Sequence, residues 1–218
     1  STTGAVTLIA NPNFENKSSY SFDVIATDNG TLTDTQAVTL AINDVNDAPV
    51  ITSDAIATSI DENSGAGQVV YTVTSTDVDA SATVSYSLSG TDASLFTIDS
   101  TTGEVTLIAN PNFENKSSYS FNVIATDNGT LTDTQAVTLS INDVNEAPVI
   151  TSSATVAIDE NIGAGQVVYT VTSTDVDASA TVTYSLSGTD ASLFTIDSTS
   201  GEVTLIANPN FENKSSYS

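Results

Sequence analysis

Carboxylate side chains recur in short motifs along the chain and are its main resource for chemistry. Asp77 and Asp79 stand two residues apart, so in an extended segment both carboxylates point to the same side. Like charges held that close repel each other, and a bound cation relieves the repulsion. Carboxylate, amide and backbone oxygens are the ligands of hard cations such as calcium. The pattern therefore indicates cation binding, although one such pair is a weak signal by itself.

The composition excludes several classes of function. The 218 residues include 27 Asp and Glu but only three Lys and Arg, and the formal charge is -24. Nucleic-acid binding needs cationic side chains, and an anionic membrane surface would repel this chain. With no His and no Cys, the usual catalytic nucleophile pairs and zinc sites are excluded. No apolar run approaches the roughly 20 residues that cross a bilayer, so no membrane insertion is expected.

An internal repeat of nearly one hundred residues organises the chain. The segment NPNFENKSSYS begins at Asn11, Asn110 and Asn208, with spacings of 99 (110 minus 11) and 98 (208 minus 110) residues. This period is typical of an independent β-sandwich domain rather than a solenoid coil. Linkers placed at the DVNDAP and DVNEAP segments give a window on a longer array. Residues 1–47 are the C-terminal half of one repeat, 48–146 a complete repeat, and 147–218 the N-terminal part of the next.

Within the complete repeat, apolar residues alternate with polar ones, as half-buried β-strands require. Val69, Tyr71 and Val73 form one such run, and five further runs follow. Asn128-Gly129 predicts a short hairpin between the last two strands. No stretch has helical periodicity. We therefore predict an all-β fold of tandem seven-stranded Greek-key β-sandwich repeats of immunoglobulin-like size.

The acidic motifs occur in a fixed order along one repeat, which is more specific than any of them alone. The motifs are Asp61-Glu62-Asn63, Asp77 with Asp79, Asn112-Phe113-Glu114, Ala125-Thr126-Asp127 and Asp143-Val144-Asn145-Glu146-Ala147-Pro148. In this order they resemble the motifs of the cadherin repeat, and the resemblance covers the whole chain. The chain is similar in particular to the cadherin-like tandem repeats of large bacterial surface adhesins, because the copies are nearly identical and rich in Thr and Ser.

The resemblance implies that calcium ions bind at the junctions between repeats. The ligands would come from the base of one repeat, from the linker, and from the top of the next repeat. The first junction would use Asn13, Glu15, Asp44, Asn46, Asp47, Asp77, Asp79 and Asp127. The second would use Glu62, Asn112, Glu114, Asp143, Asn145, Glu146, Asp175 and Asp177.

Departures from the family pattern weaken one ion site. Asn112 stands where the family has an aspartate, so one negative charge is lost, and Glu146 replaces the linker aspartate that Asp47 keeps. We expect two to three calcium ions per junction, two of them firm and the third weak or missing. Acidic residues outside the motifs are expected on solvated faces. These are Asp23, Asp34, Asp92, Asp99 and Glu104.

The predicted function is an extracellular, secreted or cell-surface array of structural and adhesive repeats, stiffened by calcium. It would serve as the spacer or stalk of an adhesin or filament. Its partners would be neighbouring repeats, with homotypic or host contacts made by domains outside this window. The alternative is that the repeats themselves bind a glycan or self-associate. An enzyme using paired carboxylates is disfavoured, because the acids map onto junctions rather than one cleft.

Overall fold

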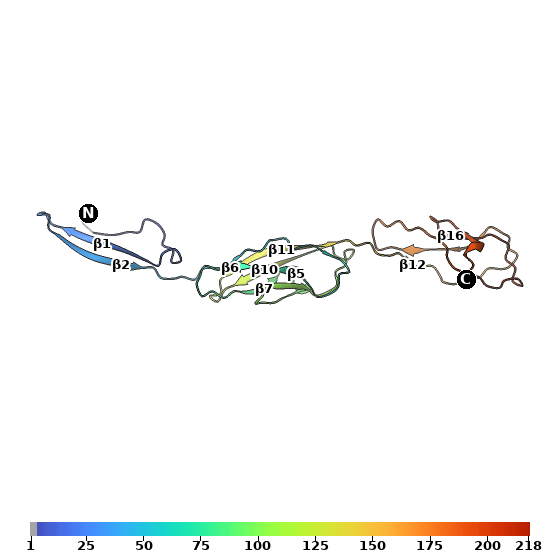
Figure 1. The fold of residues 1–218 in the computed structure, drawn as a ribbon, viewed down its shortest axis with the longest axis horizontal. Helices are drawn as coiled ribbons and strands as arrows, with labels where there is room; N and C mark the ends of the chain where they lie inside the picture. The colour runs from blue at the N-terminus through green and yellow to red at the C-terminus, as the bar shows by residue number, and fades with distance from the viewer. Residues whose placement is uncertain (1–3) are drawn as a thin grey trace. The chain divides into compact units, whose positions relative to one another are not determined.

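The computed structural model describes residues 4–218 and separates into two compact units, one ending at Asn142 and the other running from Asp143 to Ser218. The first unit begins with an antiparallel hairpin (Figure 1), formed by β1 (Ser19–Thr27) and β2 (Thr33–Ala41). In this hairpin Phe22 lies opposite Val38. A β-sandwich follows this hairpin. Its strands are β3 (Val50–Ile51), β4 (Ile60–Asp61), β5 (Gln68–Thr72), β6 (Ser75–Thr76), β7 (Ser85–Ser89), β8 (Phe96–Ile98), β9 (Glu104–Leu107), β10 (Ser118–Thr126) and β11 (Thr132–Asn142).

The sandwich has one sheet of four strands in the order β4-β11-β10-β7 and one of three in the order β5-β9-β8. A short pair, β3 with β6, extends it. The four-stranded and three-stranded sheets together contain seven strands. Among the described residues, helix is limited to two 3-10 turns, η1 (Ala93–Leu95) and η2 (Ala191–Leu193). The predicted all-β fold is confirmed.

The core of this sandwich is aliphatic and aromatic, as strand alternation predicts. Successive inward residues of β10 and β11 are buried, including Phe121, Val123, Val137 and Leu139 at 1% exposure or less. The Phe96 ring packs on Phe121 with centroids 4.5 Å apart. The two sheets therefore meet across a continuous apolar layer, which holds the loops at the ends of the strands in place.

One strand departs from simple alternation. The sequence predicts Val69, Tyr71 and Val73 on one face, but Val69 is 53% exposed while Val70 is 6% exposed. The reason is a β-bulge between Val69 and Tyr71 in the pairing of β5 with β9. A bulge inserts one extra residue into a strand, so residues before it change face.

The hairpin joining β10 and β11 exists, but its loop is longer than Asn128-Gly129 predicts. The strands end at Thr126 and restart at Thr132, and the positive φ of 75° falls on Thr130. The Asp127 carboxylate accepts the backbone N–H of Leu131 at 2.9 Å, which closes a five-residue loop. Side-chain capping therefore selects this loop in place of the two-residue turn.

The expectation that Asp92 lies on a solvated face is wrong. Asp92 is 8% exposed, accepts the backbone N–H of Ser120 at 2.8 Å and pairs with Lys116 Nζ at 3.1 Å. The bond from Ser120, together with Lys116, holds the pKa of Asp92 below its usual range despite burial. Asp190 makes the same contacts with Lys214 and Ser218 in the second unit.

The second unit reproduces only part of the sandwich. Its strands β13 (Gln166–Thr170), β16 (Glu202–Leu205) and β15 (Phe194–Ile196) form a three-stranded sheet with the register of β5, β9 and β8, bulge included. A short pair, β12 (Val149–Ile150) with β14 (Ser173–Thr174), matches β3 with β6. Among residues 143–218 the structure contains no counterpart of the four-stranded sheet.

Candidate metal centre

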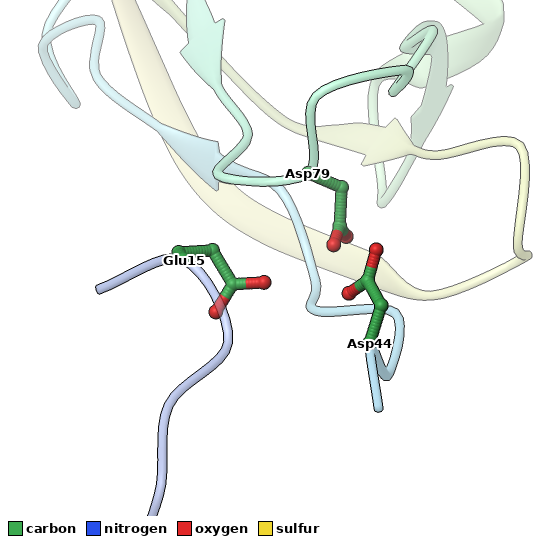
Figure 2. Close-up of side chains that lie close together, drawn as sticks. All are labelled: Glu15, Asp44 and Asp79. Carbon is green, nitrogen blue, oxygen red and sulfur yellow. The ribbon is translucent and has the colours of Figure 1, made fainter. Parts of the chain in front are cut away.

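Three segments of the first unit bring carboxylates together at one point. Glu15 lies in the turn before β1, Asp44 in the linker after β2, and Asp79 in the loop after β6. Figure 2 shows their carboxylate groups pointing toward one another. One oxygen from each lies within 4.8 Å of the others. The sequence assigned these residues to the base of one repeat, the linker and the top of the next repeat.

This spacing fits a calcium ion. Calcium binds oxygen at about 2.3 to 2.6 Å, so two ligands on opposite sides of the ion are separated by about 5 Å at most. The donor set of Glu15, Asp44 and Asp79 supplies hard, anionic oxygen only. Two ion pairs occur within residues 4–218, and neither involves these three residues. Their mutual repulsion is therefore not offset by a lysine.

The linker is also tied to the D-x-D pair. The backbone N–H of Asp47 donates to Asp79 Oδ2 at 2.9 Å, and the backbone N–H of Asp79 donates to Asp77 Oδ1 at 3.0 Å. The other Asp77 oxygen, Oδ2, is buried and has no hydrogen-bond partner in the described part of the chain. A buried carboxylate oxygen without a donor is costly, and a cation satisfies it.

A second linker contact reaches the loop after β10. The side-chain amide of Asn46 donates to Asp127 Oδ2 at 2.8 Å. Asp127 is 5% exposed, and burial alone would raise its pKa. The bonds from Asn46 and from the backbone N–H of Leu131 outweigh burial and lower the pKa of Asp127. Asp127 is therefore held as an anion beside the linker.

The residues expected at the second junction are divided between the two units. In the first unit, the buried carboxylate of Glu62 accepts the backbone N–H of Phe113 at 2.8 Å, which fixes it beside the N-F-E segment. Asn112 donates from Nδ2 to Glu114 Oε2 at 3.1 Å. These three predicted ligands thus lie on neighbouring loops of the first unit.

The second unit repeats the linker geometry. The backbone N–H of Glu146 donates to Asp177 Oδ2 at 3.0 Å, as Asp47 donates to Asp79. The backbone N–H of Asp177 donates to Asp175 Oδ1 at 3.1 Å. Asn145 donates to the Glu146 carbonyl at 2.9 Å, and Asp143 opens this unit. A glutamate in place of the linker aspartate therefore leaves these backbone contacts unchanged.

Sequence reasoning missed a structural role of the N-F-E asparagine. Asn112 Oδ1 accepts the backbone N–H of Asn115 at 2.8 Å and so closes a turn. Asn13 does the same with Asn16 at 2.7 Å, and Asn210 with Asn213 at 2.9 Å. The three-residue spacing of two asparagines in each copy is the signal that could have revealed it.

Comparisons with known proteins agree with this organisation. Residues 56–142 match the family model of the cadherin domain. The chain is built of cadherin-domain repeats. It is 34% identical to human protocadherin Fat 4 over 91% of its length, and 33% identical to mouse cadherin EGF LAG seven-pass G-type receptor 2 over 99%. It spans 4% and 8%, respectively, of the lengths of those relatives.

Solved structures show the same fold. The crystal structure of mouse cadherin-23 EC22-24 has a TM-score of 0.69 and 28% identity, covering 93% of this chain and 68% of that one. The human cadherin-23 EC21-23 structure gives a TM-score of 0.68 and 25% identity, covering 92% of this chain and 68% of that one. The predicted fold class is thereby confirmed.

The match to the cadherin family bears on several of the predictions about function. Cadherin repeats are non-enzymatic adhesion modules, so the prediction that these repeats are not an enzyme is confirmed. Cadherin ectodomain repeats are extracellular, as predicted. They bind calcium at inter-domain junctions and pack with neighbouring repeats. No helix within residues 4–218 is long and apolar enough to span a membrane.

Proposed function

We propose that this chain is a calcium-rigidified segment of an extracellular repeat array, with a structural and adhesive role. The observation that supports this most strongly is the cluster of Glu15, Asp44 and Asp79. Each carboxylate comes from a different segment of the chain: one before β1, one in the linker and one after β6. An ion bound by all three joins these segments and replaces repulsion by attraction.

A second ion position is supported by the loop contacts on the other side of the linker. Asp77 contributes a buried oxygen that no donor satisfies, and Asp127 is held as an anion by Asn46. We propose that Asp77, Asp79 and Asp127 hold an ion, with the linker residues Asn46 and Asp47 completing its surroundings. Millimolar calcium outside cells matches the roughly 10⁻⁴ to 10⁻³ M affinities of extracellular modules.

We propose that the second junction works in the same way. Its first half would come from Glu62, Asn112 and Glu114, and its second half from Asp143, Asn145, Glu146, Asp175 and Asp177. Support comes from each unit separately, because the backbone contacts of Glu146, Asp177 and Asp175 reproduce those of the first linker. Two to three ions would bind per junction, the weakest being the one nearest Asn112.

The proposed repeat boundaries follow from the same sites. Residues 1–47 would belong to one repeat, 48–146 to a complete repeat and 147–218 to the next. In support, the family match at residues 56–142 lies inside the proposed complete repeat.

The wider role is also a proposal: the array would be the spacer or stalk of a surface adhesin or filament, contacting its target through domains outside this segment. The near-identical copies still favour a bacterial source.

Small-angle scattering of the chain in calcium and in chelator tests the proposal. We expect the maximum dimension to be larger and better defined in calcium, because ion-bound linkers resist bending. Asp79→Asn should reduce that difference. Asp23→Asn is the matched control, because Asp23 is exposed and the equivalent residue of the complete repeat is already Asn122. Equal scattering in calcium and chelator for the unmodified chain would refute calcium stiffening.

A further inference from the structure

Asn128 is followed by glycine, a pair that supports a spontaneous reaction between side chain and backbone. The backbone nitrogen after an asparagine can attack the side-chain carbonyl carbon, and a side chain on that next residue hinders the attack. Glycine has no side chain and leaves its nitrogen accessible. Within residues 48–146, Asn128 is the only asparagine that precedes glycine; the seven others precede serine, proline, phenylalanine, lysine, valine, aspartate or glutamate.

The fold leaves this pair accessible to water. Asn128 and Gly129 are both exposed, and they lie in the loop between the end of β10 at Thr126 and the start of β11 at Thr132. Neither residue takes part in the cross-strand register of β10 and β11. The reacting atoms are therefore not fixed by the sheet, and water reaches them directly.

A backbone donor lies on the carbonyl group that would be attacked. The N–H of Thr83, in the segment before β7, donates to Asn128 Oδ1 at 3.1 Å. Attack on the side-chain carbonyl carbon moves negative charge onto this oxygen, and a donor already in place stabilises that charge. The contact with Thr83 therefore favours the reaction of Asn128 as well as positioning its side chain.

We propose that Asn128 is a site of spontaneous deamidation, promoted by the Thr83 N–H. The Gly129 nitrogen forms a bond to Asn128 Cγ and loses its proton to water. The bond from Cγ to Nδ2 breaks, and the amide nitrogen takes up a proton and leaves as ammonia, which closes a succinimide ring. A water molecule then opens the ring at either carbonyl and gives aspartate or isoaspartate. Water is the only co-reactant.

Both products change the loop where it meets the linker. The Asn46 amide donates to Asp127 Oδ2 at 2.8 Å, and a Cβ on Gly129 would lie 2.6 Å from Asn46 Cγ, so the contact has no spare room. Isoaspartate adds one atom to the backbone at this point. Both products also place a negative charge next to the Asp127 carboxylate. Deamidation should therefore displace Asn46 and release the linker from the loop.

Peptide mapping by mass spectrometry, with aspartate and isoaspartate peptides separated, tests the proposal on the full chain incubated in chelator at neutral pH. We expect Asn128 to convert before Asn115, which is also exposed but precedes Lys116. Incubation in urea gives the rate without the fold. There Asn29 and Asn128 should convert equally, because residues 24–40 and 123–139 are identical. In the folded chain Asn128 should convert at least as fast as in urea.

The role of the Thr83 N–H is tested by removing it. Thr83→Pro should slow conversion of Asn128 in the folded chain about fivefold, as for the loss of one ordinary hydrogen bond. Ala80→Pro is the matched control. Ala80 occupies the second position of a turn closed by Ala82 N–H and the Asp79 carbonyl at 3.0 Å, a position that accepts proline. Melting curves in chelator show whether both variants fold, and the comparison with urea needs neither of them.

Three results would overturn the proposal. The first is slower conversion of Asn128 in the folded chain than in urea, because the fold would then protect it. The second is conversion of Asn115 ahead of Asn128. The third is an equal rate in the unmodified chain and in a folded Thr83→Pro variant.

The effect on calcium binding rests on the proposed function, whereas the reaction itself does not. Asn29→Gln leaves Asn128 as the only Asn-Gly pair, so ageing this variant isolates one modification. We expect its isoaspartate form to bind calcium about fivefold more weakly than the fresh chain, because the bond from Asn46 to Asp127 is lost. Equal affinities would contradict the displacement of Asn46. A fresh chain that binds no calcium would refute the proposed function instead, since conversion of Asn128 is measured in chelator.

Discussion

The side-chain amide of Asn46 donates a hydrogen bond of 2.8 Å to the carboxylate of Asp127. This contact ties the linker to the loop that joins β10 and β11, 81 residues further along the chain. The amide also lies close to a glycine of that loop. Gly129 does not have a positive φ, but a Cβ there would lie 2.6 Å from Asn46 Cγ. A methyl group at this position would therefore displace the Asn46 amide.

Gly129→Ala should therefore weaken calcium binding more than folding. The added methyl group displaces the Asn46 amide. Loss of the hydrogen bond from this amide to Asp127 lowers the free energy of unfolding by about 1 kcal/mol. Gly30→Ala is the matched control at the equivalent loop position, where the nearest atom to an added Cβ is Asp28 Oδ1 at 3.2 Å. Calorimetric calcium titration of both variants measures the effect. Equal calcium affinities in the two variants would contradict this role for Gly129.

Asn112→Asp should have opposite effects with and without calcium. The aspartate keeps an oxygen that accepts the Asn115 N–H, so the turn survives. In chelator the new charge faces Glu114 and replaces the present hydrogen bond with repulsion, lowering the melting temperature. In calcium the added charge should strengthen the weakest ion site. Three equally strong sites in the unmodified chain would show that the amide oxygen suffices.

The sequence was sufficient to predict the architecture because the relevant signals are local. Alternation along β10 and β11 predicts which residues are buried, and Val123 and Leu139 follow it. The bulge in β5 could not be predicted, because it depends on pairing with β9 rather than on Val69 and Tyr71 themselves. Alternation alone therefore assigned Val69 to the wrong face.

The candidate site was predictable for a different reason. Its motifs are short and recur in a fixed order that resembles the cadherin repeat, and this resemblance implied that Glu15, Asp44 and Asp79 share one junction before their proximity was known. Asp92 was misjudged because no motif marks it. Its burial depends on Lys116 and Ser120, which are remote in sequence and reach it only in the folded sandwich.

The Asp92 ion pair predicts a pH dependence of stability that is separate from calcium. Its pKa is lowered in the folded state, so its contribution is present above the ordinary carboxyl pKa of about 3.9 and is lost as the pH falls through the folded-state value. Asp92→Asn should lower the free energy of unfolding by about 1 to 3 kcal/mol at neutral pH. That cost should shrink in acid.

Urea unfolding in chelator, over a pH series, measures this cost without interference from calcium ligands. Asp23→Asn serves as the control, since Asp23 is exposed in the described structure. The effect of Asp23→Asn on the free energy of unfolding should stay small at every pH of the series. If the difference between the unmodified chain and Asp92→Asn were constant down to the lowest pH at which the repeat folds, Asp92 would not be a charged partner of Lys116.

Thermal unfolding in millimolar calcium and in chelator tests calcium binding at the acidic clusters most directly. An ion present at ten to a hundred times its dissociation constant stabilises the folded state by roughly 1.4 to 2.7 kcal/mol. We therefore predict a higher melting temperature in calcium. Magnesium should give a smaller rise, because it demands tighter octahedral geometry. Superimposable unfolding curves in calcium and chelator would contradict the assignment of Glu15, Asp44 and Asp79 to a calcium site.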